Sequence, residues 1–129
     1  MKASRVRVLS LLVAAGLLLT GGAAMATIHF VAPDGSGDFG TIQEAIWACA
    51  NGDTVELGDG IFRGNWNRLI DFMGLSITVR SRSGDPQACW IDVDGDPENQ
   101  RFGFVFHTGE TSEARVVGIG VTGGFDLGC

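Results

Sequence analysis

Three aspartates within five residues are the strongest candidate for metal chemistry in this sequence. Asp92, Asp94 and Asp96 alternate with Val93 and Gly95. Carboxylate oxygens are the ligands that Ca²⁺ prefers, so the stretch indicates a calcium site if it folds around an ion. It does not follow the EF-hand pattern, because proline stands at the sixth position and glycine at the twelfth. The competing interpretation, which we favour, is a solvated turn rich in aspartate.

Cysteine chemistry is open to two interpretations. An exported chain enters an oxidising compartment, where Cys49 and Cys89 could form a disulfide bond. The alternative, which we favour, is that both are buried thiols that pack as small apolar side chains. The chain has three cysteines, so at most one internal bridge can form. Cys129 is the last residue, and we expect the natural chain to continue beyond it.

Other reactive side chains form no recognisable catalytic constellation. His29 and His107 have no serine or cysteine nearby in a nucleophile-like context, so surface positions are expected for both. Two carboxylates that face one cleft would suit glycoside hydrolysis, but fifteen acidic residues single out no pair. Trp47, Trp66 and Trp90 can stack on sugar rings or pack in a core. We therefore assign no catalytic residue and expect this chain alone to be inactive.

The first 26 residues have the features of a signal peptide. Three basic residues within the first seven precede an apolar stretch, and the sequence Ala-Met-Ala at residues 24–26 matches a cleavage site. The apolar stretch is shorter than a comfortable membrane span, and no second stretch follows it. We expect a secreted protein, periplasmic or extracellular, whose mature domain covers residues 27–129 and contains no membrane span.

The mature domain is strongly acidic. Six arginines and no lysine stand against fifteen acids, which gives a formal charge of −9 after removal of the leader. Such a surface repels phosphate backbones, so no nucleic-acid partner is expected. Acidic polysaccharides would also be repelled unless Ca²⁺ or a local basic groove mediates the contact.

Residues 41–50 are predicted to form a short amphipathic helix. Thr41 and Glu44 are spaced as a capping box. The residues at helical spacing on its apolar face are Ile42, Ala45, Ile46 and Cys49. Asn51 and Gly52 are expected to end the helix through a left-handed C-terminal cap.

After the helix, alternating apolar residues predict short β-strands. The residues expected to face inward are Val55, Leu57, Leu75, Ile77, Val79, Cys89, Ile91, Val93, Phe102, Phe104, Phe106, Ile119 and Val121. Aligning the glycine before each strand places Val55, Ile77 and Val121 in one column at multiples of 22 residues. A repeat of this length indicates a solenoid with coils of three short strands. The helix would then be a lid over the exposed apolar end, whereas an ordinary helix packed on an open sheet leaves the spacing unexplained.

Several motifs resemble one known group of proteins. The sequence VAPDGSGDFGTIQEAI, residues 31–46, resembles the N-terminal segment of pectin methylesterases and of many secreted right-handed parallel β-helix proteins. Residues 51–81, beginning NGDTVELGDG, resemble a stretch common in bacterial proteins of the pectate-lyase-like superfamily, and IDVDG and GIGVTGG look like later coils. The resemblance covers residues 28–124. It implies an all-β, right-handed parallel β-helix with a short N-terminal capping helix, truncated at its C-terminus.

The resemblance also implies a function. Relatives of this kind bind or process polysaccharide as lyases, esterases or hydrolases, so a polysaccharide or cell-surface component is the expected partner. The catalytic residues and Ca²⁺-binding acids of those enzymes lie on later coils, and none can be matched to a position here. The alternative is a non-catalytic surface or adhesin-type solenoid, in which stacking itself provides a long rigid rod.

Overall fold

The computed structural model describes residues 25–124 and confirms an all-β class with little helix. Its elements in chain order are β1 (Ile28–Val31), α2 (Ile42–Trp47), β2 (Thr54–Leu57), β3 (Gly60–Phe62), β4 (Ile70–Asp71), β5 (Thr78–Ser81), β6 (Cys89–Asp92), β7 (Phe104–Val105), β8 (Arg115–Val117) and β9 (Gly120–Thr122). The predicted signal peptide lies almost wholly outside the described residues. Within those residues, no helix has the length and apolar character needed to cross a bilayer.

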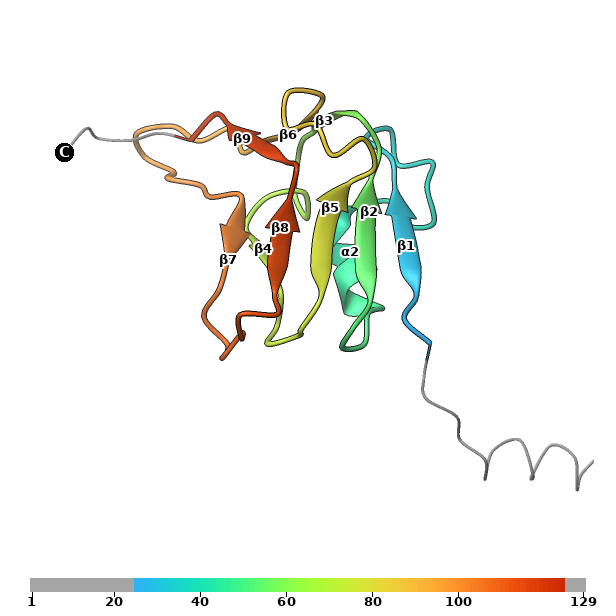
Figure 1. The fold of residues 1–129 in the computed structure, drawn as a ribbon. Coiled ribbons are helices and arrows are strands. Elements are labelled where there is room, and N and C mark those ends of the chain that lie inside the picture. Colours follow the sequence, from blue (N-terminus) through green and yellow to red (C-terminus); the bar gives the residue numbers. More distant parts are fainter. Residues whose placement is uncertain (1–24, 125–129) are drawn as a thin grey trace, which may run out of the picture.

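The strands form three parallel sheets, with the orders β1-β2-β5-β8, β3-β6-β9 and β4-β7. Consecutive strands enter the sheets in rotation, because β2, β3 and β4 each belong to a different sheet and β5, β6 and β7 repeat that order (Figure 1). Strands β8 and β9 begin the order again. Neighbours within a sheet are therefore distant in sequence, and the intervening loops turn the chain from one sheet to the next.

The register of the strands differs from the predicted one. Val55 pairs with Val79, and Val79 pairs with Val116, at separations of 24 and 37 residues. Val121 lies in β9, which belongs to a different sheet. The predicted column of Val55, Ile77 and Val121 and its 22-residue spacing are therefore wrong. A shift of two residues leaves every side chain on the same face of a strand, so the alternating pattern could not distinguish 22 from 24.

The alternation of inward and outward residues is confirmed in the inner strands. The predicted inward residues that are fully buried are Val55, Leu57, Ile77, Val79, Cys89, Ile91 and Val93. Phe104 packs against the core, and Phe106 and Val121 lie on the inner side but are 50% and 47% exposed, since Phe106 contacts the buried Phe72 and Val121 pairs with the buried Ile91. The prediction is wrong for Phe102, which is 59% exposed. Strands β7, β8 and β9 are the outermost of their sheets in the described part, so no further strand there packs over them.

Helix α2 begins as predicted and ends earlier. The hydroxyl of Thr41 accepts a hydrogen bond from the backbone N–H three residues on, at 3.3 Å, as an N-cap does. The fully buried apolar residues of its inner face are Ile42, Ala45 and Ile46. The helix ends at Trp47 with Ala48 in a right-handed cap, so the predicted left-handed cap is wrong. Gly52 has a φ of +92° but belongs to the turn before β2, where its N–H donates to the carbonyl of Ser76.

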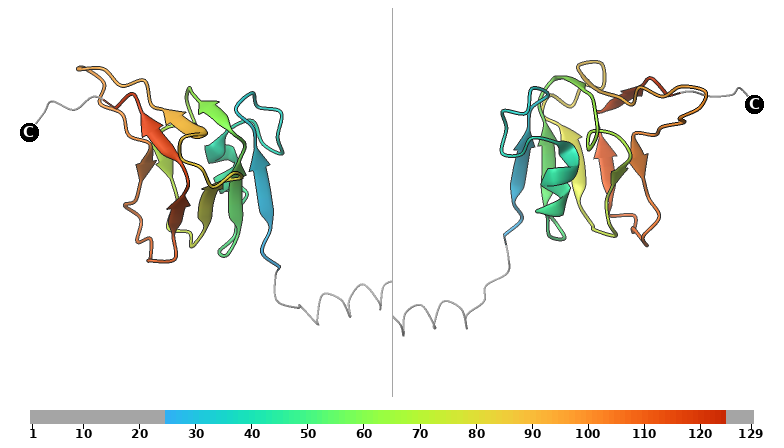
Figure 2. Two further views of the ribbon diagram at one scale, coloured as in Figure 1. Left: turned by 45° about the horizontal axis from the view of Figure 1, so that its top comes forward. Right: turned by 180° about the vertical axis from the view of Figure 1, so that it is seen from behind.

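Helix α2 contacts β1, β2 and β4 and lies on one face of the sheet that contains β1 and β2 (Figure 2). The buried side-chain amide of Gln43 pairs with the backbone of Asp71 in β4, donating from Nε2 at 3.0 Å and accepting at Oε1 at 2.8 Å. Asn67 Oδ1 accepts a hydrogen bond from the N–H of Ile42 at 2.9 Å. These side chains satisfy backbone groups that the edge of β4 and the first helical turn would otherwise leave unpaired.

The outer edge of β1 is also covered. The N–H of Phe30 donates to Asp38 Oδ2 at 2.8 Å, and the N–H of Asp38 donates to the carbonyl of Phe30 at 2.7 Å. This close approach requires glycine at position 37, because a Cβ on Gly37 would lie 2.5 Å from the Phe30 carbonyl oxygen. A covered edge cannot recruit strands from other chains, which is how natural sheets avoid aggregation.

Candidate functional site

The three predicted metal ligands near the end of β6 are engaged in separate contacts. Asp92 Oδ2 accepts a hydrogen bond from Arg63 Nε at 3.0 Å. Asp94 has an 83% exposed side chain that lies 3.8 and 3.9 Å from two arginines. Asp96 accepts the backbone N–H groups two and three residues on, at 2.9 and 2.8 Å. Among the described residues, the group of metal-ligating side chains whose ligand atoms lie within 4.8 Å of one another does not include these three aspartates.

Cys49 and Cys89 are free thiols, so the disulfide considered from the sequence is absent from the structure. They lie on different elements: Cys49 follows α2 and donates to the carbonyl of Ala45 at 3.3 Å, whereas Cys89 begins β6 and pairs with Gly60. Burial, helped by a nearby aspartate in each case, raises the pKa of both thiols to about 11. Both are therefore protonated at neutral pH. Cys129 lies outside the described residues.

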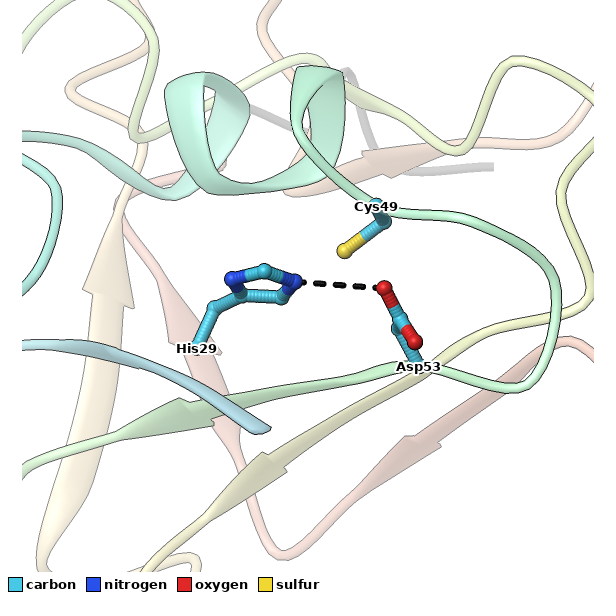
Figure 3. Close-up of side chains that lie close together, drawn as sticks. All are labelled: His29, Cys49 and Asp53. Carbon is cyan, nitrogen blue, oxygen red and sulfur yellow. Dashed lines mark hydrogen bonds and ion pairs between the residues drawn. The ribbon is translucent and has the colours of Figure 1, made fainter. Parts of the chain in front are cut away.

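Among the described residues, His29, Cys49 and Asp53 form a compact group of metal-ligating side chains (Figure 3). His29 lies in β1, Cys49 follows α2, and Asp53 directly precedes β2. One ligand atom of each lies within 4.8 Å of the others, and His29 Nε2 is 3.2 Å from Asp53 Oδ2. The side chain of His29 is only 14% exposed, so the expected surface position is wrong for this histidine.

Asp53 is the fixed centre of this group. Its carboxylate accepts the backbone N–H of Ala50 and that of Thr27, each at 2.9 Å, in addition to its contact with His29. These hydrogen bonds, with that of Ala50 the strongest, hold the pKa of Asp53 below its ordinary value in spite of partial desolvation. Asp53 is therefore an anion at neutral pH.

The sequence pattern did not indicate this group because its members are dispersed along the chain. His29 and Asp53 are 24 residues apart and become neighbours only when β1 pairs with β2. In that pairing Ile28 lies opposite Thr54, which brings Asp53 to Thr27. The sequence does show an aspartate directly before a predicted strand. Which residues lie next to that aspartate can be predicted only when the strand register is known.

His107 forms a second histidine–aspartate pair. Its Nε2 is 3.0 Å from Asp71 Oδ2, and its side chain is 62% exposed, so the predicted surface position is confirmed here. In the part of the chain that the structure describes, no third metal-ligating side chain joins this pair. The pair can be compared with the group around His29, because it contains a histidine and an aspartate but no thiol.

Two of the three tryptophans lie together on the surface. Trp47, at the end of α2, is 52% exposed, and Trp66, in the β3–β4 loop, is 53% exposed. Their ring centroids are 5.1 Å apart in an edge-to-face arrangement.

Trp66 also lines a surface hollow of about 220 Å³. The residues that line the hollow are Asn65, Trp66, Arg68 and Leu69. Trp90 is different, because it is half-buried and donates from Nε1 to the carbonyl of Gln87.

The loop that carries the hollow is held by several contacts. Arg68 donates to the carbonyl of Val93 at 3.1 Å and to Asn65 Oδ1 at 2.9 Å. The carbonyl of Trp66 accepts the N–H of Gln43 at 2.9 Å. Trp66 has a φ of +70°, a conformation that a bulky residue adopts only where its surroundings enforce it. The hollow is therefore preorganised.

Replacing Asp53 by asparagine is expected to lower stability at neutral pH and to remove part of its acid dependence. A carboxylate with a lowered folded pKa stabilises the fold above its unfolded pKa of about 3.9, and this contribution is lost as the pH falls through the folded value. The wild type should exceed D53N by about 1 kcal/mol or more in free energy of unfolding near pH 7. The difference should shrink between about pH 5 and pH 2. Denaturant titrations across this pH range measure the difference in free energy of unfolding. A difference that stays constant with pH would contradict the lowered pKa of Asp53.

Comparison with known proteins provides no assigned relative. No protein-family model, no curated protein and no solved structure matches this chain. The functional assignment therefore rests on the residues themselves and on their geometry.

Proposed function

We propose that this chain is the capped N-terminal part of a secreted, right-handed parallel β-helix protein of the pectate-lyase-like kind, and that it binds polysaccharide. Support for the architecture comes from parallel strands that enter three sheets in rotation. Further support comes from α2, which contacts β1, β2 and β4, and from Gln43, whose amide pairs with β4. Successive coils would bury their apolar faces against one another and leave a long lateral surface for a saccharide chain.

The observation that carries the binding function is the exposed Trp47–Trp66 pair beside a preorganised hollow. The apolar faces of sugar rings pack on exposed aromatic rings, and the hydroxyl groups take up directional hydrogen bonds. Asn65 and Arg68 offer amide and guanidinium groups for those hydrogen bonds at the same hollow.

Local charge favours a neutral or esterified saccharide over a polyuronate. The guanidinium of Arg68 already lies 3.9 Å from the carboxylate of Asp94 and donates two hydrogen bonds within the protein. The domain without the predicted leader has six arginines against fifteen acids, a formal charge of −9, which repels anionic polymers at long range. An uncharged sugar ring avoids both penalties.

Replacing Trp66 by alanine should weaken saccharide binding by at least about tenfold, which corresponds to roughly 1.4 kcal/mol. The probes are methyl-esterified pectin, polygalacturonate and a neutral β-glucan, with affinity gel electrophoresis or calorimetry as the readout. Trp47→Ala should weaken binding in the same direction. Trp90→Phe is the control, because Trp90 lies in β6 and does not line the hollow, and it should bind as the wild type does.

The outcomes separate the candidate functions. Binding of the esterified or neutral probe that W66A loses and W90F retains supports the proposal. Equal binding by W66A and the wild type would exclude the tryptophan pair as the site. Failure of the wild type to bind any of the three probes would contradict the proposal and favour the non-catalytic, adhesin-type solenoid.

A further inference from the structure

We propose that His29, Cys49 and Asp53 form a three-ligand site for Zn²⁺ or a divalent metal ion with similar ligand preferences. The three side chains come from β1, from the turn after α2 and from the residue before β2 (Figure 3). The site does not depend on the saccharide function, because it shares no residue with the tryptophan hollow.

The donor set determines which ions fit. One imidazole nitrogen, one thiolate sulfur and one carboxylate oxygen are the three ligand types that Zn²⁺ uses in proteins. Three protein ligands leave the fourth tetrahedral position for water. Ca²⁺ and Mg²⁺ require sets of oxygen ligands, so a site with only one carboxylate discriminates against them.

The distances are close to those of a tetrahedral site. Zinc–nitrogen and zinc–oxygen bonds near 2.1 Å place two ligand atoms about 3.4 Å apart. His29 Nε2 and Asp53 Oδ2 are 3.2 Å apart. The sulfur of Cys49 lies within 4.8 Å of the other two ligand atoms and would need to stand about 3.6 Å from them. It would therefore move by at most about 1.3 Å from its hydrogen bond with the carbonyl of Ala45.

The surrounding contacts hold two ligands in position before an ion arrives. The carboxylate of Asp53 is fixed by the N–H groups of Ala50 and Thr27. The ring of His29 stands edge-on to Phe39, with centroids 5.5 Å apart. Such supporting contacts orient ligands and increase metal affinity.

Binding would replace existing contacts in a balanced way. The thiol of Cys49 loses its proton to solvent as the sulfur–metal bond forms. The imidazole of His29 gives up its contact with Asp53: Nε2 releases its proton to solvent, Nδ1 takes one up from solvent, and the lone pair of Nε2 then binds the ion. The ion would join β1 to the turn between α2 and β2, and an ion that binds only the folded chain stabilises it.

Zinc titration of the chelator-treated, purified protein tests the proposal. A chromophoric chelator competes for Zn²⁺, and mass spectrometry under native conditions gives the stoichiometry. We expect one tightly held ion per chain and a melting temperature that rises with Zn²⁺ concentration. C49S and H29Q should each lose at least about tenfold in affinity for Zn²⁺. Loss of a residue that only supports a ligand usually costs about that much, and loss of a ligand should cost no less. Co²⁺ should give a thiolate charge-transfer band that C49S lacks.

Two controls distinguish this site from adventitious binding. H107Q removes the exposed histidine of the pair with Asp71, and C129S removes another thiol; neither should change the affinity. Melting curves in chelator show whether C49S and H29Q remain folded. The proposal would be overturned if C49S and H29Q both bound Zn²⁺ with the stoichiometry and affinity of the wild type. It would also be overturned if the wild type held no ion more tightly than these variants do.

Discussion

Replacing Ile46 by aspartate is expected to abolish cooperative folding. Ile46 is fully buried on the face of α2 that packs against the sheets. A carboxylate there would lose its hydration without gaining a partner, and the isoleucine contacts would be lost as well. The combined cost should exceed about 4 kcal/mol, a large part of the roughly 5–15 kcal/mol that stabilises a typical domain. Circular dichroism during thermal unfolding should show no sharp transition for I46D.

Ile61→Asp is the matched control, because it makes the same chemical change on a strand. Ile61 lies in β3 with 47% of its surface exposed, so I61D should change the free energy of unfolding by no more than about 0.5 kcal/mol. If I46D melts as the wild type does, α2 does not close the apolar interior. If I61D fails to fold, the outward face of β3 has been assigned wrongly.

Replacing Phe72 by alanine should destabilise the fold by about 3–5 kcal/mol. Phe72 is fully buried directly after β4. Its ring centroid lies 6.1 Å from that of Phe104 in β7 and 4.9 Å from that of Phe106, which directly follows β7. Removal of the ring would open a cavity between two successive strands of one sheet. Urea unfolding should show a lower midpoint with little change in slope.

Phe102→Ala makes the same change at an exposed position. Phe102 is 59% exposed, so F102A should cost less than about 1 kcal/mol. A large cost for F72A and a small one for F102A would place the stabilising contact between β4 and β7. Equal costs for the two variants would contradict that placement.

Local features of the fold could be predicted from short-range patterns. Thr41 is an N-cap because its hydroxyl reaches a nearby backbone N–H, and this depends only on adjacent residues. Val55 and Leu57 face inward because alternation assigns faces within a strand. The register could not be predicted in the same way, since Val55 meets Val79 through a loop length that periodicity does not define.

The side-chain clusters depend on that register and so were missed. Gln43 lies between apolar residues of α2 and is buried because its amide pairs with β4, which no helical pattern indicates. His29, Cys49 and Asp53 meet only when β1 lies beside β2. Asp92, by contrast, was singled out by local composition, and its carboxylate is used by Arg63.

Nuclear Overhauser contacts between methyl groups of successive parallel strands test the stacked arrangement most directly. Parallel stacking with the present register predicts contacts from Val55 to Val79 and from Val79 to Val116 in the wild-type protein. Backbone contacts between β2 and β5 should follow the parallel pattern as well. Contacts from Val55 to Val121, or an antiparallel pattern between β2 and β5, would contradict it.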